Sequence, residues 1–150
     1  MATTYFIAAL RCPHCGVVSP CDSSTGMASK LLWEPGFHLL RAGDCPEIDV
    51  HDLGLSYLTL RAPEPEVPVR LLELWYCASS HDRNWAQVTL RSGCVERIEA
   101  VLPTRALVDQ AHFLTESIDD IYEQLTGVPL YVDGELRPDF AERLKASLPE

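Results

Sequence analysis

The chain has 150 residues, 47% of them hydrophobic and 23% charged, and its formal net charge is −10. This length suits one domain that buries about 68–70% of its unfolded surface, so we expect a single domain over residues 1–150. Its acidity disfavours nucleic acid as a partner and favours basic proteins. The chain has no apolar run near the roughly 20 residues that cross a bilayer and no secretion signal at its start, so we expect no membrane contact and a cytoplasmic location.

The first part of the chain alternates between strand-like runs and turn-rich stretches. The strand-like runs are rich in aromatic and β-branched residues or alternate in polarity, whereas the turn-rich stretches hold Gly, Pro, Ser and Asp. We expect strands, or a hairpin in the middle of the series, at 3–10, 31–33, 37–40 and 56–61. We expect loops at 19–29, 42–54 and 62–68.

The clearest sheet signal lies in the middle of the chain. Residues 69–76, 85–91 and 95–102 are strand-like runs, and Ser92-Gly93 separates the last two. Gly is favoured in tight hairpin turns because it adopts positive φ at little cost. These runs therefore predict an antiparallel meander with Gly93 in its final turn.

The apolar period becomes helical after this meander. Thr104 is suited to cap a helix that runs to about Phe113, and Pro138 is suited to the first turn of a final helix. A helix between them has one apolar face, formed by Ile118, Ile121, Tyr122 and Leu125. Strands that precede helices indicate the α+β class: an antiparallel sheet with two to three C-terminal helices.

Residues 12–15 (CPHC) resemble the active-site sequence of DsbA-type thiol oxidases. A catalytic C-x-x-C pair lies where a strand ends and a helix begins, because the helix N-terminus lowers the pKa of the attacking thiol. Residues 16–20 (GVVSP) instead combine Gly, two β-branched residues and Pro, which disfavour a helix. We therefore favour metal binding over thiol oxidation at this pair.

The same cysteines also match a C-P-x-C-G knuckle, in which a tight turn points backbone N–H groups at the sulfurs. On residues 12–16 the chain resembles a zinc ribbon, a family in which two β-hairpin knuckles share one tetrahedral ion. We expect the second knuckle at residues 77–81 (CASSH), where the family more often has Cys-x2-Cys. The resemblance implies a zinc-ribbon-like knuckle pair and four Zn²⁺ ligands, namely Cys12, Cys15, Cys77 and His81.

Other assignments of the cysteines are compatible with the sequence. Cys21 could replace Cys77 or His81, with Cys45 or His51 completing the four ligands. Alternatively no metal binds and the cysteines behave as small buried hydrophobic residues. Without a secretion signal we expect thiols or metal ligands rather than disulfides, and Cys94 is expected to be only a strand residue.

The expected zinc is structural. Four protein ligands with three thiolates leave no open position for water, and the H-E-x-x-H, G-x-S-x-G and P-loop motifs are absent from the sequence. We therefore predict a non-enzymatic protein that binds a basic protein partner, such as an inhibitor or immunity-type antidote to a basic toxin or nuclease. The alternatives are a zinc-ribbon nucleic-acid or transcription-associated module, and an enzyme with an unrecognised site.

Overall fold

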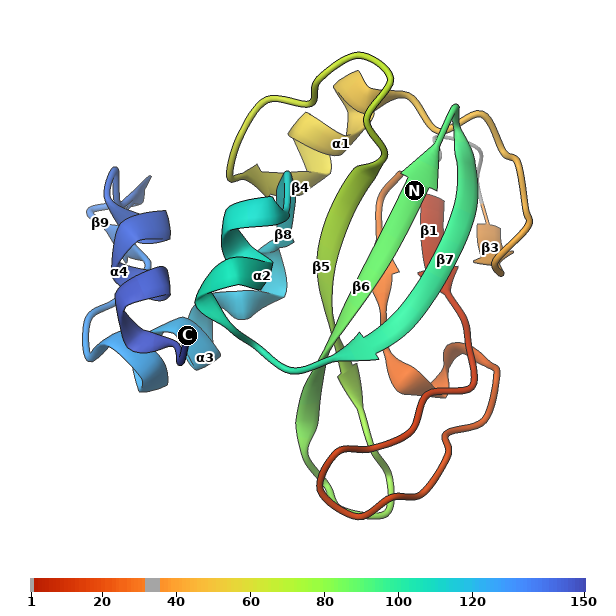
Figure 1. Ribbon diagram of the computed structural model, residues 1–150, viewed down its shortest axis with the longest axis horizontal. Coiled ribbons are helices and arrows are strands. Elements are labelled where there is room, and N and C mark those ends of the chain that lie inside the picture. Colours follow the sequence, from red (N-terminus) through yellow and green to blue (C-terminus); the bar gives the residue numbers. More distant parts are fainter. Residues whose placement is uncertain (1, 32–35) are drawn as a thin grey trace.

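The computed structural model describes residues 2–31 and 36–150 and has a twisted five-stranded sheet at its centre (Figure 1). The strand order is β4-β8-β5-β6-β7, and all neighbours are antiparallel except β5 and β8. The strands are β4 (Tyr57–Thr59), β5 (Val69–Tyr76), β6 (Arg83–Arg91), β7 (Cys94–Val101) and β8 (Phe113–Thr115).

The expected meander is confirmed as β5, β6 and β7. Ser92 and Gly93 both have positive φ, 52° and 78°, and form the tight turn between β6 and β7. A turn with two residues of positive φ matches the right-handed twist of the flanking strands and favours glycine. Gly93 between two strand-like runs therefore predicted this hairpin. Along β5 the side chains alternate between two hydrophobic clusters: Leu71 belongs to one and Leu72 to the other.

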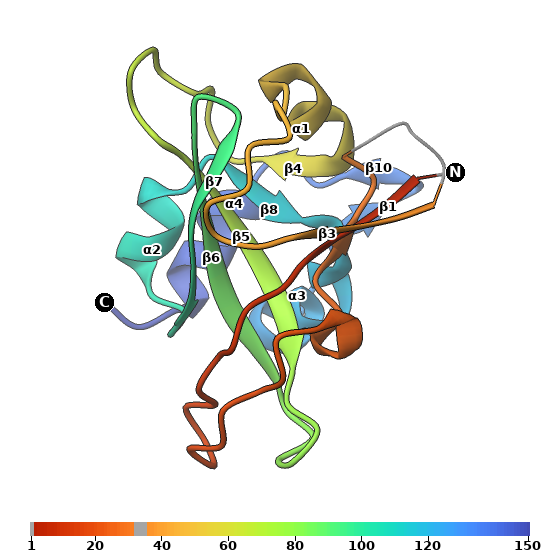
Figure 2. The same ribbon diagram turned by 90° about the vertical axis from the view of Figure 1, so that its right-hand side faces the viewer.

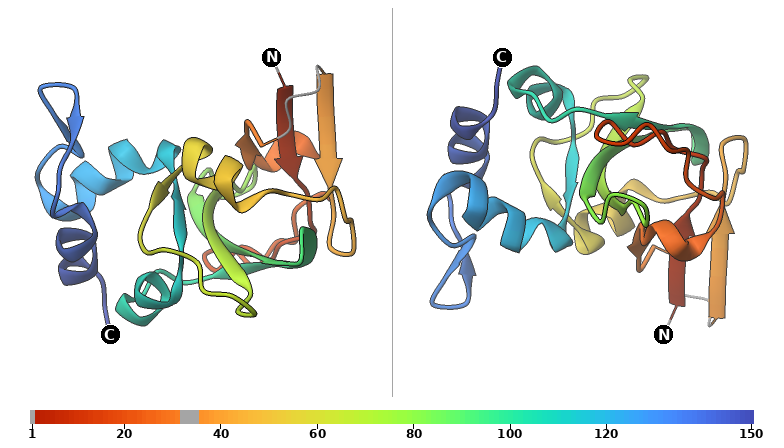
Figure 3. Two further views of the ribbon diagram at one scale, coloured as in Figure 1. Left: turned by 90° about the horizontal axis from the view of Figure 1, so that it is seen from above. Right: turned by 90° about the horizontal axis from the view of Figure 1, so that it is seen from below.

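Helices cover one face of this sheet (Figures 1 and 3). They are α2 (Arg105–Gln110), α3 (Asp119–Thr126) and α4 (Phe140–Ser147), preceded at α3 by the 3₁₀ turn η2 (Glu116–Ile118). The predicted cap is confirmed, since Thr104 Oγ1 accepts the Leu107 N–H at 3.1 Å. The hydrophobic cluster between these helices and the sheet includes Leu72, Leu74, Trp85, Leu114, Tyr122 and Leu144.

The helix expected from Thr104 to Phe113 ends earlier, at Gln110. Phe113–Thr115 forms β8 instead, between β4 and β5. A three-residue strand is too short to show a period of its own, and its pairing with two distant strands decides its conformation. Between α3 and α4, β9 (Tyr131–Val132) and β10 (Glu135–Leu136) form a small hairpin, and Asp133 and Gly134 in its turn both have positive φ.

A second, smaller sheet covers the opposite face of the central sheet (Figure 2). Its order is β2-β1-β3, with β1 (Ala2–Phe6) antiparallel to β2 (Ala28–Ser29) and parallel to β3 (Gly36–Leu40). The strand expected at 37–40 is confirmed, whereas the piece expected at 31–33 lies mostly outside the described residues. The cluster between the two sheets includes Phe6, Leu10, Met27, Leu71, Trp75 and Val88.

The loop expected over 42–54 is wrong in its last part, where the helix α1 (Val50–Ser56) forms. Asp49 caps it, because its side chain accepts the His51 N–H at 2.9 Å. Leu53 is the one buried residue among the seven of α1. A helix with a single buried position has no repeating apolar pattern that the sequence could show. The loop expected over 19–29 likewise includes the 3₁₀ turn η1 (Ser23–Thr25) and β2.

The fold is therefore mixed α and β with a mostly antiparallel central sheet, as the α+β class requires. The longest helices, α3 and α4, have eight residues each. None of the helices in residues 2–31 and 36–150 has the length and apolarity to cross a membrane.

Candidate metal centre

Two turns from distant parts of the chain meet at one end of the central sheet. The first cysteine turn, residues 12–17, follows β1, and the second cysteine turn, residues 77–82, joins β5 to β6. They lie side by side at the bottom of Figures 1 and 2. The first turn brings Cys12 and Cys15 to this end of the molecule, and the second brings Cys77.

The first cysteine turn is held by its own backbone. The Cys12 N–H donates to the Val17 carbonyl at 3.0 Å, and the Gly16 N–H donates to the Cys12 carbonyl at 2.9 Å. Gly16 has a φ of 76°, which a glycine adopts without strain. The His14 N–H lies 3.4 Å from Cys12 Sγ. As the sequence predicted, Cys12 and Cys15 lie in a turn, and no helix begins at them.

The second cysteine turn makes similar contacts. The Cys77 N–H donates to the Asp82 carbonyl at 2.9 Å, and the His81 N–H donates to the Cys77 carbonyl at 2.8 Å. The Ser80 N–H lies 3.5 Å from Cys77 Sγ. His81 has a φ of 61°, a left-handed conformation that is uncommon outside glycine.

The two turns bring three thiols together. The Sγ atoms of Cys12, Cys15 and Cys77 all lie within 4.8 Å of one another, and those of Cys15 and Cys77 are 3.6 Å apart. Two thiolates on a tetrahedral zinc, each at about 2.3 Å, are separated by about 3.8 Å. Cys12 and Cys77 are buried, and Cys15 is exposed. These three cysteines lie close enough to bind one metal ion.

Polar groups surround the Cys12 sulfur. The Ser80 hydroxyl lies 3.4 Å from it, and the Asn84 side-chain amide donates to it at 3.5 Å. Asn84 is itself buried at the start of β6, and its Oδ1 has no hydrogen-bond partner in the part of the chain that the structure describes. Donors aimed at a sulfur stabilise its thiolate form, which is the form that binds metals.

These contacts divide the three thiols by acidity. Burial opposes ionisation of Cys12, but the Ser80 hydroxyl and backbone N–H groups of the turn outweigh it and lower the pKa to about 6. The pKa of Cys77 is lowered by the hydroxyl and N–H of Ser80. A hydrogen bond from the Val17 backbone favours the thiolate of Cys15. Lost hydration and the neighbouring sulfurs of Cys77 and Cys12 oppose it more strongly, so the pKa of Cys15 is raised. A cation would relieve that opposition.

The fourth expected ligand, His81, does not lie with the three sulfurs. Its Nδ1 is 2.7 Å from the Tyr76 hydroxyl, and the two ring centroids are 6.2 Å apart. The backbone N–H of His81 holds the turn while its exposed side chain lies along Tyr76. Ser80, which the sequence did not predict as a ligand, is the residue beside the sulfurs. Its spacing from Cys77, the same as that of Cys15 from Cys12, was the available signal.

The remaining cysteines have other roles. Cys21 is an exposed free thiol outside the three-thiol group, and His51 lies on α1, at the other end of the sheet in Figure 1. Cys45 and Cys94 form a disulfide. The expectations that disulfides are absent, that Cys94 is only a strand residue and that Cys45 could be a ligand are therefore wrong.

Backbone pairing explains why this disulfide forms. The segment before α1 runs beside the start of β7: the Gly43 N–H donates to the Val95 carbonyl, and the Val95 N–H donates to the Asp44 carbonyl, both at 2.7 Å. This pairing places Cys45 next to Cys94. The sequence separation of 49 residues leaves no local signal for it.

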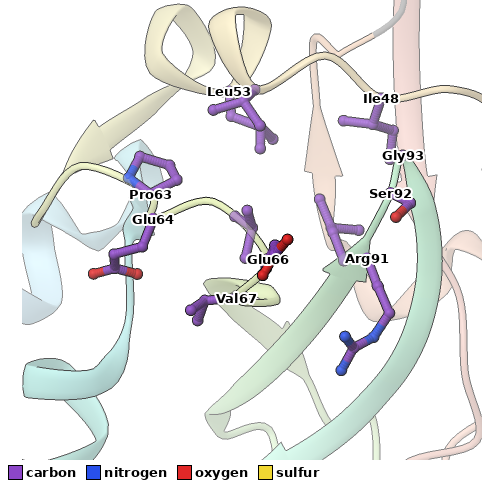
Figure 4. Close-up of a pocket in the computed structure, with 12 residues that line it drawn as sticks. Ile48, Leu53, Pro63, Glu64, Glu66, Val67, Arg91, Ser92 and Gly93 are labelled. Carbon is purple, nitrogen blue, oxygen red and sulfur yellow. The ribbon is translucent and has the colours of Figure 1, made fainter.

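A hollow of about 400 Å³ lies at the same end as the disulfide (Figure 4). It is bounded by α1, the 62–68 connector and the β6–β7 turn. Most of its lining is apolar, and the side chains of Glu64, Glu66 and Arg91 add charge. The apolar lining residues include Ile48, Leu53, Val67, Val69 and Leu90.

The molecule thus has two features from which a function can be argued: the three-thiol group and this hollow. No similar protein was found from which the role of either feature could be inferred. Comparisons of the chain with protein-family models, with curated proteins and with solved structures found no match.

Proposed function

We propose that this protein binds one Zn²⁺ ion through Cys12, Cys15 and Cys77, and that the ion is structural. The observation that carries the proposal is the approach of Cys12 and Cys15 to Cys77, which follows Cys15 by 62 residues. Thiolates favour zinc over the hard cations Mg²⁺ and Ca²⁺. The resemblance of the two cysteine turns to the paired knuckles of a zinc ribbon supports the same ion.

The ion would join the N-terminal layer to the central sheet. The first cysteine turn belongs to the layer formed by β1–β3, and the second belongs to the hairpin of β5 and β6. Structural zinc sites supply roughly 10–16 kcal/mol of apparent binding energy, against a typical domain stability of about 5–15 kcal/mol. The ion would therefore account for much of the stability of this end of the fold.

We further propose that the protein acts by binding a basic protein. A net charge of −10 favours encounter with a positively charged surface. The hollow at the disulfide end offers an apolar floor with Glu66 beside it, while Glu64 and Arg91 of the same lining are paired with Arg61 and His112 and with Glu96. Glu66 beside an apolar floor suits a lysine or arginine next to an apolar side chain. A basic toxin or nuclease is a partner of this chemistry, and an inhibitor or immunity-type antidote is the corresponding role.

Metal analysis tests the first part of the proposal. Protein purified without added zinc should contain one zinc per chain, and Cys77→Ser should lose it. Cys21→Ser is the matched control, because Cys21 is a free thiol outside the group, and it should keep the ion. A folded wild-type protein with less than about a tenth of an equivalent of zinc would overturn the proposal.

Charge reversal tests the binding role. Glu66→Lys should weaken capture of a basic protein from native lysate, and the same capture should fall as salt rises. Glu123→Lys on the exposed side of α3 changes the net charge equally and should weaken capture less. If both variants capture the same proteins at every salt concentration, the acidity serves solubility alone and the binding proposal fails.

A further inference from the structure

The two cysteine turns share one backbone pattern. In each, the first cysteine donates its N–H to the carbonyl five residues later and accepts, at its own carbonyl, the N–H of the residue four positions later. In each, that later residue has positive φ, and a backbone N–H of the turn points at the first sulfur. The correspondence, position by position, is Cys77 to Cys12, Ser80 to Cys15 and His81 to Gly16.

This correspondence assigns Ser80 the position that a second cysteine would occupy. The zinc-ribbon knuckle usually has Cys-x2-Cys, and the second cysteine turn has Cys-x2-Ser at the same spacing. His81 occupies the glycine position, where the backbone conformation and not the side chain is required. Its imidazole lies instead against Tyr76.

Distances at the site agree with an oxygen at the fourth corner. The Ser80 hydroxyl is 3.4 Å from Cys12 Sγ, and the backbone N–H of the same residue lies 3.5 Å from Cys77 Sγ. On a tetrahedral zinc, an oxygen at about 2.1 Å and a sulfur at about 2.3 Å are separated by about 3.6 Å. The Cys12–Ser80 distance of 3.4 Å and the Cys15–Cys77 distance of 3.6 Å are thus both close to those between ligands of one tetrahedral ion.

We propose that the fourth coordination position of this metal lies at Ser80 and is open to an exogenous thiolate. This inference rests on the proposed zinc site and deepens it. A neutral serine hydroxyl, or a water in its place, binds zinc more weakly than a thiolate does, and zinc sites with three protein ligands keep the fourth position exchangeable. Ser80 is only half-buried and Cys15 of the same group is exposed, so a thiol from solvent or from a partner can reach this position.

Binding of the thiolate is a ligand exchange and not a redox reaction. The incoming thiol would give up its proton to solvent and its sulfur would form the fourth bond to the metal. The bond from the metal to the neutral Ser80 hydroxyl would break, or a water bound there would leave. The source of the thiol is either a small molecule or a cysteine side chain of another protein. Both present the same sulfur to the same position.

Cobalt substitution tests the inference, because sulfur-to-cobalt charge-transfer absorption grows with the number of thiolates. The wild-type protein should show the intensity of three thiolates. Ser80→Cys should show that of four, with metal affinity raised by more than about tenfold, since a direct ligand should contribute at least as much as an outer-shell partner. Ser80→Ala should keep three thiolates and provides a variant that adds no ligand.

His81→Gly is the matched control at the neighbouring position. It removes the imidazole and supplies the residue that the first cysteine turn has at this φ. Its cobalt spectrum should equal that of the wild type. A change in the ligand-field bands of His81→Gly would show that the imidazole is a ligand and would overturn the inference, as would Ser80→Cys that keeps the intensity of three thiolates.

Thiol titration identifies the source of the fourth ligand. Addition of 2-mercaptoethanol, or of a lysine-flanked peptide with one cysteine, should raise the charge-transfer intensity of the cobalt-substituted wild type and leave Ser80→Cys unchanged. Tighter binding of the peptide indicates a protein partner, and tighter binding of 2-mercaptoethanol indicates a small thiol. A wild type that binds cobalt and responds to neither overturns this inference alone, whereas a wild type that binds neither cobalt nor zinc overturns the proposed zinc site.

Discussion

At both ends of the central sheet, cysteines from earlier in the chain lie beside cysteines of the sheet or its turns, but in different ways. At one end Cys12 and Cys15 meet Cys77 at the β5–β6 turn, and all three are free thiols. At the other end Cys45 meets Cys94 beside the β6–β7 turn, and the two form a disulfide. The same amino acid thus serves a candidate metal site and a covalent bond within one sheet.

The difference lies in how the turns are built. Both turns of the cysteine cluster point backbone N–H groups at sulfur, which favours thiolates and a cation between them. The Cys45–Cys94 pair lies instead on two backbones that run side by side and exchange hydrogen bonds, which suits a direct bond between two sulfurs. With the proposed ion bound, the central sheet would have a link to its neighbouring layer at each end.

Metal removal should have the largest effect and should act on one end only. Chelation of the ion, or Cys12→Ser, should lower the free energy of unfolding by several kcal/mol, a large part of a typical domain stability of about 5–15 kcal/mol. Hydrogen exchange should quicken first at the amides of the two cysteine turns, while Val95 beside the disulfide stays protected. Equal loss of protection at both ends would show that the ends are not independent.

Loss of the disulfide should have the next largest effect. Its sulfurs join residues 49 positions apart, and a loop of that length contributes about 4 kcal/mol in the chain-entropy model. Cys94→Ser should therefore lower the free energy of unfolding in denaturant titrations, with Cys21→Ser as the neutral control. Denatured, unreduced, metal-free protein should contain four titratable thiols of its six cysteines. A count of six would contradict the disulfide.

A smaller effect should come from Glu73, which lies on β5 between the two ends. Burial raises its pKa to about 8, although hydrogen bonds from Tyr57 and Thr115 oppose the rise. The folded protein keeps this proton up to about pH 8 whereas the unfolded chain releases it near pH 4.5. The stability that the neutral carboxyl contributes is thus complete below about pH 4.5 and is lost as pH rises towards 8.

For Glu73 this predicts a loss of about 2 kcal/mol in unfolding free energy between pH 6 and pH 8. Glu73→Gln should remove that part of the pH dependence, and Glu123→Gln on the surface should not. The difference between variant and wild type cancels any titration of the thiols, which both proteins share. A variant with the wild-type pH dependence would show that Glu73 is ionised in the fold.

The local features of this protein could be predicted from its sequence. The meander of β5–β7 follows from strand-forming runs and the Gly93 turn, and α2 begins where Thr104 can cap it. Residues 16–20 predicted that no helix follows Cys15, and Gly16 has the positive φ that ends the first cysteine turn. Each of these depends on a few neighbouring residues, so the physical cause lies within the stretch that carries the signal.

Only the tertiary structure decided the features that depend on pairing between distant segments. Phe113–Thr115 is a strand because β4 and β5 lie on either side of it, and α1 forms where Leu53 finds a buried site. The Cys45–Cys94 bond depends on backbone pairing across 49 residues. The same holds at the cysteine cluster, where the choice between Ser80 and His81 depends on which side chain the turn directs towards Cys12. That direction is set by the β5–β6 hairpin and its packing against a turn more than 60 residues earlier, which no local pattern records.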